Sequence, residues 1–317
     1  MTITVLDGYT LNPGDLCWDD FEKLGDLTVH MYTPKELVLE RAKNSEVLIT
    51  NKVVLDADLI ASLPKLKYIG VIATGYNVVD TVAAKQHGVV VTNIPAYSTM
   101  SVAQHVFALL LAVTDRPEHY ACEVKEGKWS KCRDFCYWDT PLVELAGKKF
   151  GIIGMGNIGN AVAKIAQAFG MEVMAFSSKD QSRLPEGVKK VSLEELYRES
   201  DVISLHCPLT DETRHMINKN SIALMKDGVI LINTGRGPLV DEKDVAEALK
   251  ADKIGAFCAD VLSTEPPAPD NPLLSAPNTY ITPHIAWATK EARTRLMDIA
   301  VNNLKEFIAG HPVNVVN

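Results

Sequence analysis

The chain has 317 residues, of which 47% are hydrophobic and 23% are charged, and its formal net charge at pH 7 is −8. This length suggests two domains, and the composition is that of a globular protein rather than a disordered or fibrous one. The negative charge argues against general binding to nucleic acid or to anionic membranes, because such binding requires clustered Lys and Arg side chains.

The N-terminal third is predicted to alternate between strands and helices. A first strand begins at the N-terminus, which has neither the basic start nor the apolar stretch of a signal peptide. Three further apolar runs have the character of buried parallel strands, with segments of helical spacing between them. We expect these strands at 47–50, 68–72 and 89–92, and the helices at 57–63 and 79–86. This rhythm predicts an α/β domain with a parallel sheet.

An apolar helix is expected next, over Val102–Val113. A membrane span requires about 20 apolar residues, and this stretch is shorter and contains Gln104 and His105. We therefore expect a buried helix, with His105 packed in it, and no membrane association. The six cysteines lack the spacing of a disulfide framework or a zinc site, so we expect a cytoplasmic protein without a structural metal.

A second series of strands and helices begins near Lys148 and predicts a dinucleotide-binding domain. Its strands are expected at 149–153, 172–176, 202–206, 229–232, 255–259 and 279–281. Its helices are expected at 157–169, 193–198, 219–224 and 242–250. Six strands with intervening helices are what one doubly wound dinucleotide fold requires. The remaining segment, Thr289–Phe307, has the pattern of an amphipathic helix.

The first strand of this second series is followed by a G-x-G-x-x-G pattern that opens a helix. This context makes the pattern specific for a dinucleotide. Gly154 permits the tight turn, Gly156 allows the backbone to approach a pyrophosphate, and Gly159 lets the helix pack closely on the strand. The free N–H groups of the helix N-terminus, at Asn157 and Ile158, would then bind the phosphates.

The residues at the end of the following strand bear on the choice of cofactor. Binding of NAD usually involves a carboxylate about 20 positions beyond the turn. Here the sequence is Ser177-Ser178-Lys179. The two hydroxyls and the lysine, with Arg183, could instead bind the 2′-phosphate of NADP, although Asp180 could still reach the ribose. We expect a nicotinamide dinucleotide, with NADP favoured over NAD.

Three further segments each follow a strand of the second series: Ile232–Asp241, Ala259–Pro267 and Ile281–Trp287. With the glycine turn, in this order and spacing, they resemble the motifs of the D-isomer-specific 2-hydroxyacid dehydrogenase family over essentially the whole chain. The resemblance implies two Rossmann-like, doubly wound α/β domains with a cleft between them. It assigns 99–287 to the dinucleotide-binding domain, and 1–98 with 288–317 to the substrate-binding (catalytic) domain.

The resemblance makes Arg236, Glu265 and His284 the catalytic residues, and the chemistry requires these residue types. Reduction of a keto acid delivers a hydride from the nicotinamide to the carbonyl carbon and a proton to its oxygen. His284 can donate the proton because imidazole titrates near neutral pH. Glu265 would orient the ring and favour imidazolium. Arg236 offers paired donors that can hold the substrate carboxylate and polarise the carbonyl.

The resemblance also implies which residues surround the cofactor and the substrate. Besides the glycine turn and the Ser177–Lys179 segment, the cofactor-binding residues would be Cys207, Pro208, Thr213, Thr234, Gly235, Arg236, Asp260 and His284. Within this set, Asp260 would contact the nicotinamide carboxamide. The substrate-binding residues would be Arg236 and His284 with Thr74, Gly75 and Tyr76, whose backbone N–H groups would hold the carboxylate. His206 is expected to be structural.

The segment 120–140 carries several aromatic residues in a predicted loop. In the family this region is an arm that packs on a second subunit, and an aromatic cluster suits such an interface. We therefore expect a homodimer formed through this region. Burial of the same aromatics within one subunit is the alternative.

Thr74-Gly75-Tyr76 and Trp287 are most similar to the glycerate dehydrogenase and hydroxypyruvate reductase members of the family. The expected reaction is hydride transfer between NAD(P)H and a small 2-keto acid, either hydroxypyruvate/D-glycerate or glyoxylate/glycolate. Two alternatives stay open. One is an NAD(H)-binding corepressor-like or scaffold protein on the same fold. The other is a formate or phosphite dehydrogenase, although formate dehydrogenase relatives pair Gln with His where this sequence has Glu265 and His284.

Overall fold

The computed structural model describes all 317 residues, which divide into two compact units. Unit 1 comprises Met1–Ser98 and Trp287–Asn317, and unit 2 comprises Thr99–Ala286. The resemblance assigns 99–287 to the dinucleotide-binding domain, and unit 2 ends one residue earlier, at Ala286. The ring of Trp287, in unit 1, packs edge-on against Tyr97, with 6.2 Å between the ring centroids.

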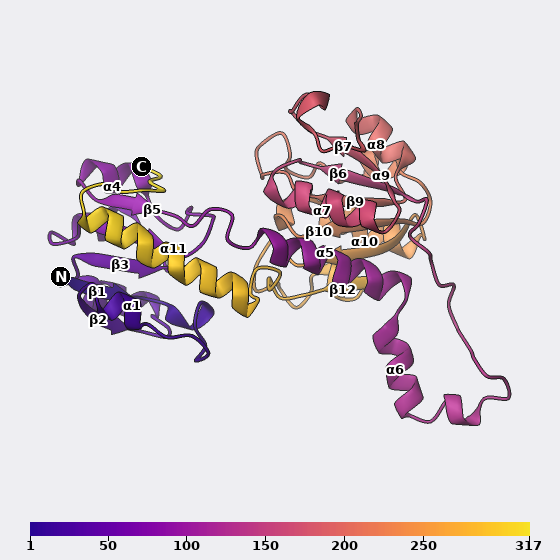
Figure 1. The fold of residues 1–317 in the computed structure, drawn as a ribbon, viewed down its shortest axis with the longest axis horizontal. Coiled ribbons are helices and arrows are strands. Elements are labelled where there is room, and N and C mark those ends of the chain that lie inside the picture. The colour runs from indigo at the N-terminus through magenta and orange to yellow at the C-terminus, as the bar shows by residue number, and fades with distance from the viewer. The chain divides into compact units, whose positions relative to one another are not determined.

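Unit 1 is built on a five-stranded parallel sheet with the order β2-β1-β3-β4-β5 (Figure 1). Its strands are β1 (Thr2–Val5), β2 (Asp26–Val29), β3 (Val47–Thr50), β4 (Tyr68–Val71) and β5 (Val90–Thr92). Its α-helices are α1 (Asp19–Glu22), α2 (Val38–Ala42), α3 (Ala57–Ala61), α4 (Thr81–Gln86) and α11 (Lys290–Ile308). This strand order is that of a doubly wound sheet.

Helices cover both faces of the unit 1 sheet because side chains alternate along its buried strands. In β3, Val47 and Ile49 pack on the face that carries α11, whereas Leu48 packs with α2, α3 and α4. The helix α11, yellow in Figure 1, buries Leu296 and Leu304 in the first of these cores. The segment after α11 continues to the sheet, where the Val316 N–H donates to the Val91 carbonyl (2.9 Å).

Unit 2 contains a seven-stranded parallel sheet with the order β12-β11-β10-β9-β6-β7-β8. Its strands are β6 (Lys149–Ile153), β7 (Glu172–Phe176), β8 (Val188–Lys190), β9 (Val202–Leu205), β10 (Val229–Asn233), β11 (Ile254–Ala259) and β12 (Thr279–Ile281). Its α-helices are α5 (Thr99–Thr114), α6 (Pro117–Lys125), α7 (Asn157–Ala168), α8 (Leu193–Glu199), α9 (Lys219–Leu224) and α10 (Glu242–Lys250). The strand order is the dinucleotide-binding one, with a reversal between β6 and β9.

The unit 2 sheet also has a core on each face. The helices α5 and α7 cover one face, and α8, α9 and α10 cover the other. Phe107 of α5 stacks on Phe150 of β6 and on Phe169, with ring centroids 5.9 and 5.4 Å apart. The predicted helix at 102–113 is therefore a core element, as expected. None of the helices is both long and apolar enough to cross a membrane.

Two strands are missing from the predicted set, namely β2 of unit 1 and β8 of unit 2. Because of β8, the sheet of unit 2 has seven strands rather than the predicted six. Both are edge strands, and one side of an edge strand has no neighbour to cover it. The side chains of β2 alternate between exposed and half-buried, and β8 has only three residues. Such segments lack the apolar runs that reveal central strands.

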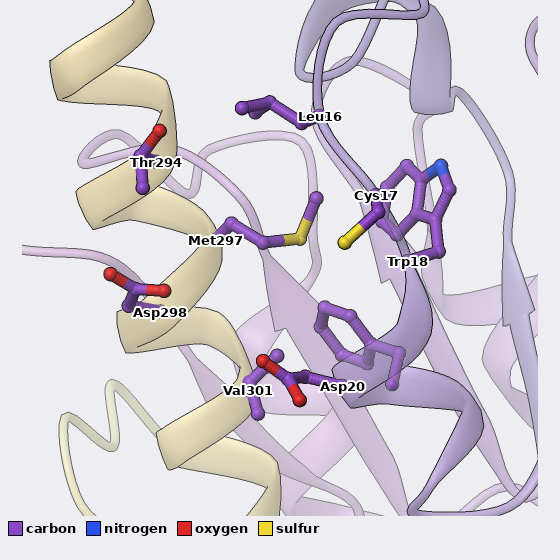
Figure 2. A pocket seen from close by; sticks show the side chains of 9 residues that line it. Leu16, Cys17, Trp18, Asp20, Thr294, Met297, Asp298 and Val301 are labelled. Carbon is purple, nitrogen blue, oxygen red and sulfur yellow. The ribbon is translucent and has the colours of Figure 1, made fainter.

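Unit 1 also has a small hollow between α11 and the segment 16–21 (Figure 2). Apolar side chains, among them Leu16, Met297 and Val301, form most of its wall. Asp298 and Asp20, the latter paired with Lys23 at 2.7 Å, add two carboxylates, and no cationic side chain lines the hollow to attract an anionic substrate. None of the predicted site residues lines this hollow.

Candidate active site

The glycine turn joins β6 to α7 and has the geometry that a pyrophosphate needs. Gly154 has φ = +100°, and a Cβ there would lie 2.5 Å from the backbone nitrogen of Cys207. A Cβ at Gly159 would lie 2.2 Å from the Gly154 carbonyl oxygen. In contrast, a Cβ at Gly156 would meet nothing within 4 Å, and no side chain caps the N-terminus of α7. The turn is thus closed toward the protein and open toward a ligand, so it fits the phosphates of a dinucleotide.

The end of β7 lies beside this turn, because the Gly154 N–H donates to the Phe176 carbonyl (3.0 Å). The Ser177 hydroxyl accepts from the Lys179 N–H (3.1 Å), which shapes the turn that follows the strand. No carboxylate occupies positions 177–179, and no protein group pairs with the Lys179 ammonium. The first acidic residue is Asp180, which precedes the short 3-10 helix Gln181–Arg183.

The segment after β9 contributes Cys207, Pro208 and Thr213. The Thr213 hydroxyl donates to the Pro208 carbonyl (2.8 Å) and accepts from the Thr210 N–H (2.8 Å), so it organises this loop from within. Burial raises the pKa of the Cys207 thiol, whose sulfur lies 3.7 Å from that of Met216. The thiol is therefore neutral and packs as an apolar group against Met216, while the backbone of Cys207 lies beside the glycine turn.

His206 is held to the sheet rather than presented to a ligand. Its Nε2 lies 2.8 Å from the hydroxyl of Ser204, which is fully buried on β9. Burial lowers the pKa of the His206 ring to about 4, so the ring is neutral at pH 7. It adds no positive charge near the phosphates.

The turn after β10 presents Arg236 to solvent. Asn233, which is fully buried, accepts from the Gly235 N–H (3.0 Å) and donates to the Arg236 carbonyl (2.9 Å). The Arg236 guanidinium contacts only the Gly235 carbonyl (2.8 Å), so most of its donors are free. The Thr234 hydroxyl is buried without a hydrogen-bond partner, as expected of a group that completes its bonding with a ligand. Asn233 lies within the segment Ile232–Asp241, but its role as the support of this turn was not predicted from the sequence.

Glu265 and His284 form a direct pair. Nδ1 of His284 lies 2.6 Å from Oε2 of Glu265, and both side chains are about one third exposed, at 32% and 35%. The other carboxylate oxygen of Glu265 accepts from the Leu262 N–H (3.2 Å). Because the carboxylate accepts from Nδ1–H, Nε2 is the ring nitrogen left for a reacting molecule.

The backbone of His284 has φ = +55°, a left-handed conformation that is uncommon for a residue with a Cβ. The two residues after it are fixed by Asp260, which is 1% exposed. Its carboxylate accepts from the N–H groups of Ile285 and Ala286, both at 2.8 Å. Asp260 is therefore bonded to the loop that carries His284, and its contact with the nicotinamide stays a prediction.

The predicted cofactor and catalytic residues of unit 2 gather at one edge of its sheet. The strands β12, β11, β10, β9 and β6 are consecutive neighbours and parallel. His284, Asp260, Arg236, Cys207 and Gly154 follow these strands in turn. Ligands of open α/β sheets bind beyond the carboxyl ends of the strands, at the reversal of strand order.

The predicted substrate loop follows β4 in unit 1. Its shape is fixed by the Thr74 hydroxyl, which donates to the Ile94 carbonyl (2.9 Å), and by Asn93, which donates to the Thr74 carbonyl (2.8 Å). No protein group accepts a hydrogen bond from the backbone N–H of Gly75 or Tyr76. The loop therefore offers two free donors that an anion could accept from.

One group of side chains in unit 2 has metal-ligating types, namely His119, Glu123 and Asp139. Lys128 already serves these carboxylates as a counter-ion, at 2.6 Å from Glu123 and 3.6 Å from Asp139. The hydrogen bond from His119 also holds the pKa of Asp139 at about 2. The group is an ion-pair network that ties α6 to the loop after it.

Residues 107–286 match the family model described as D-isomer specific 2-hydroxyacid dehydrogenase, NAD binding domain. The chain is 51% identical to the hydroxypyruvate reductase of Blautia hydrogenotrophica, with all of both chains covered. It is 45% identical to the glycerate dehydrogenase of Methylorubrum extorquens, over 90% of this chain and 89% of that one.

Solved structures agree with these sequence matches. The fold is similar to that of D-lactate dehydrogenase from Escherichia coli, with a TM-score of 0.86, 30% identity and full coverage of both chains. The TT0316 protein from Thermus thermophilus gives a TM-score of 0.87 at 36% identity, again over both whole chains. The resemblance and the two-domain α/β fold predicted from the sequence are confirmed, and a corepressor or scaffold role is not favoured. The chain belongs to the D-isomer-specific 2-hydroxyacid dehydrogenases, a family of enzymes that use NAD(P) to interconvert 2-hydroxy acids and 2-keto acids.

Proposed function

We propose that the enzyme reduces hydroxypyruvate to D-glycerate, and glyoxylate to glycolate more slowly. The observation that carries the chemistry is the 2.6 Å hydrogen bond between Glu265 and His284 at the carboxyl edge of the unit 2 sheet. The choice of substrate is supported by the relatives named hydroxypyruvate reductase and glycerate dehydrogenase, at 51% and 45% identity.

In the proposed reaction the bound nicotinamide supplies the hydride that the carbonyl carbon accepts. His284 enters as imidazolium, with Nδ1–H donated to Glu265 and Nε2–H directed at the carbonyl oxygen. As the carbon gains the hydride, the oxygen gains the Nε2 proton, and the ring is left neutral with Nδ1–H still on Glu265. The oxidation of D-glycerate runs through the same atoms in reverse.

The substrate carboxylate requires cationic or N–H donors. We propose that the free guanidinium donors of Arg236 bind it and polarise the adjacent carbonyl. The unpaired N–H groups of Gly75 and Tyr76 are proposed as further donors to the carboxylate. The buried hydroxyl of Thr234 is proposed to complete its hydrogen bonding with the cofactor.

The decisive measurement of substrate is steady-state reduction of hydroxypyruvate, glyoxylate, pyruvate and 3-phosphohydroxypyruvate by the same preparation. We expect the highest kcat/KM with hydroxypyruvate and the next highest with glyoxylate. A higher value with pyruvate or with the phosphorylated acid would contradict the assignment. The His284→Ala variant serves as the control for rates that do not come from this site.

For the cofactor we propose a preference for NADPH over NADH. Ser177, Ser178 and Lys179 would bind the 2′-phosphate, and no carboxylate at these positions would repel it. Replacing Lys179 with Ala should lower kcat/KM for NADPH about 10- to 100-fold, the worth of a charge-assisted hydrogen bond, and leave the value for NADH unchanged.

The reciprocal variant, Ser177→Asp, should favour NADH, because its carboxylate would accept from the ribose hydroxyl and repel the 2′-phosphate. The same change at an exposed serine of the same unit, Ser275→Asp, adds the same charge away from the glycine turn and is the control. A wild-type enzyme with higher kcat/KM for NADH than for NADPH would contradict the proposal and indicate NAD, with Asp180 at the ribose.

We also propose a cytoplasmic homodimer formed through the segment 120–140. In Figure 1, α6 and the loop after it extend away from the sheet of unit 2. The loop exposes Trp129, Phe135 and Trp138 at 51%, 88% and 66% of their surfaces. Large aromatics left in water are costly, and they are typical of interface centres.

Sedimentation velocity of the wild type and of a Phe135→Ser/Trp138→Ser variant tests the dimer. We expect the wild type at twice the monomer mass and the variant at the monomer mass. Tyr9→Ser, which changes an exposed aromatic of unit 1, is the matched control. A wild-type monomer, or a variant that remains dimeric, would contradict the proposed interface.

A further inference from the structure

Two side chains of α5 contact the loop that carries His284. Ser101 and His105 are one helical turn apart and so lie on the same face of α5. The Ser101 hydroxyl donates to the Ala286 carbonyl (2.5 Å). Nε2 of His105 lies 2.9 Å from the hydroxyl oxygen of Thr282. The loop is thus held to α5 at a point before His284 and at a point after it.

The hydroxyl of Thr282 fixes the direction of this hydrogen-bond chain. Its oxygen lies 2.6 Å from Oδ1 of Asp260, and a carboxylate only accepts. The single hydroxyl proton therefore points to Asp260, and Thr282 must accept from His105. The order is His105 Nε2–H to Thr282, and Thr282 O–H to Asp260.

Asp260 is the last acceptor in this hydrogen-bond chain, and it also binds the backbone of the loop that carries His284. Its carboxylate is buried, and Oδ1 accepts from Thr282 and from the Ile285 N–H, while Oδ2 accepts from the Ala286 N–H. The only basic side chain within 4 Å of it is the ring of His105, at 3.6 Å from Oδ1. These bonds fix the backbone on both sides of His284, whose φ of +55° would otherwise be unfavourable.

We propose that His105 is a positioning residue of the active site. Through Thr282 and Asp260 it holds the backbone of residues 282–286 in the conformation that aims His284 at the substrate. The sequence predicts that His105 is a packed helix residue, but a packing role would not need its Nε2–H donor. The inference rests on the proposed role of His284 as proton donor.

The test compares two replacements of His105 that differ in the donor. His105→Leu keeps much of the volume and removes the donor, whereas His105→Gln places an amide N–H near the position of Nε2. We expect His105→Leu to lower kcat about 10- to 100-fold, as small misplacements of catalytic groups do, with KM for the cofactor unchanged. His105→Gln should recover most of this loss. Gln104→Leu, at the neighbouring exposed position of α5, is the control for adding a leucine.

The solvent deuterium isotope effect on kcat gives a second readout. A misplaced His284 slows proton transfer in particular, so the effect should be larger in His105→Leu than in the wild type or in His105→Gln. Thr282→Val removes the next link without touching α5, and it should lower kcat in the same way. The double variant should then be no slower than either single one, because each single replacement already interrupts the hydrogen-bond chain from His105 to Asp260. Thr282→Val keeps the test valid if His105→Leu does not fold.

A wild-type kcat and isotope effect in His105→Leu or Thr282→Val would overturn the inference. So would a His105→Gln enzyme as slow as His105→Leu, because the donor would then be irrelevant. Failure of the proposed function is distinguished by His284→Ala. If that variant keeps the wild-type kcat, the proposed role of His284 as proton donor is wrong. If it is slow and His105→Leu is not, only the proposed positioning role of His105 is wrong.

Discussion

His284 faces Glu265 with one ring nitrogen and leaves the other, Nε2, without a protein partner. A general acid with this arrangement loses its function when the ring is removed. His284→Ala should lower kcat about 10²- to 10⁴-fold, the usual contribution of general acid–base catalysis. Cofactor affinity, measured by fluorescence titration with NADPH, should fall far less than kcat, because His284 is only one of the predicted cofactor-binding residues. His87→Ala, at an exposed position of unit 1, is the control, and an unchanged kcat in His284→Ala would remove its catalytic role.

Arg236 is exposed and its guanidinium is bonded only to its own turn. If its donors bind the substrate carboxylate, Arg236→Ala should cost about 2–4 kcal/mol in kcat/KM for hydroxypyruvate. The cost should largely vanish with an uncharged ketone, which has no carboxylate to hold. Arg214→Ala removes an exposed arginine of the same unit and is the matched control. An equal loss with both kinds of substrate would mean that Arg236 does not bind the carboxylate.

At the scale of elements, two glycines of the turn before α7 are expected to have different roles, Gly159 in folding and Gly156 in cofactor binding. Gly159→Ala should destabilise unit 2, because its Cβ would overlap the Gly154 carbonyl, 2.2 Å away. Gly156→Ala should fold normally, because a Cβ there points into open space. It should nevertheless weaken NADPH binding, because that space is where the pyrophosphate is expected.

Thermal unfolding and fluorescence titration of both variants separate these effects. Gly228→Ala is not a suitable control, because Gly228 has φ = +78°. Ala161→Gly, in the second turn of α7, is the better one, since it exchanges the same two residues away from the glycine turn. It lowers helix propensity and removes one partly buried methyl group. A Gly156→Ala enzyme that binds NADPH like the wild type would place the pyrophosphate elsewhere.

The sequence predicts central elements better than edges and contacts. Val47–Thr50 is buried at every position and was identifiable as a strand, whereas Asp26–Val29 alternates and has a neighbour on one side only. Glu265 and His284 were identifiable as a pair because the family motif carries both. His105 and Thr282 are 177 positions apart, and nothing in the local pattern of either residue indicates that the other is its partner. The support of the site by Asn233 and α5 is therefore visible only in the structure.

At the scale of the whole molecule, His206 makes stability depend on pH. Its pKa is lowered to about 4 in the folded protein, so between about pH 6.5 and pH 4 the unfolded chain binds a proton that the folded one does not. This residue should therefore remove stability as the pH falls through that window, by at most about 3 kcal/mol. Above pH 6.5 it should have no such effect.

Urea unfolding of the wild type and of His206→Gln at several pH values between 7.5 and 4 tests this expectation. Because glutamine does not titrate, the advantage of the wild type over the variant should shrink as the pH falls. His87→Gln, which changes an exposed histidine, should follow the wild type. Parallel curves for the wild type and His206→Gln would contradict the expected linkage.

Unit 1 is assembled from two stretches of chain that flank the whole of unit 2. During synthesis, a nascent chain that has reached residue 286 contains all of unit 2 but lacks α11, which fills one face of the unit 1 sheet. Domains fold as units once their residues have left the ribosome. The cofactor-binding unit should therefore mature first, although the polypeptide of the other unit begins to emerge earlier. Pulse proteolysis of ribosome-bound chains arrested at increasing lengths should show protection of residues 99–286 before protection of residues 1–98.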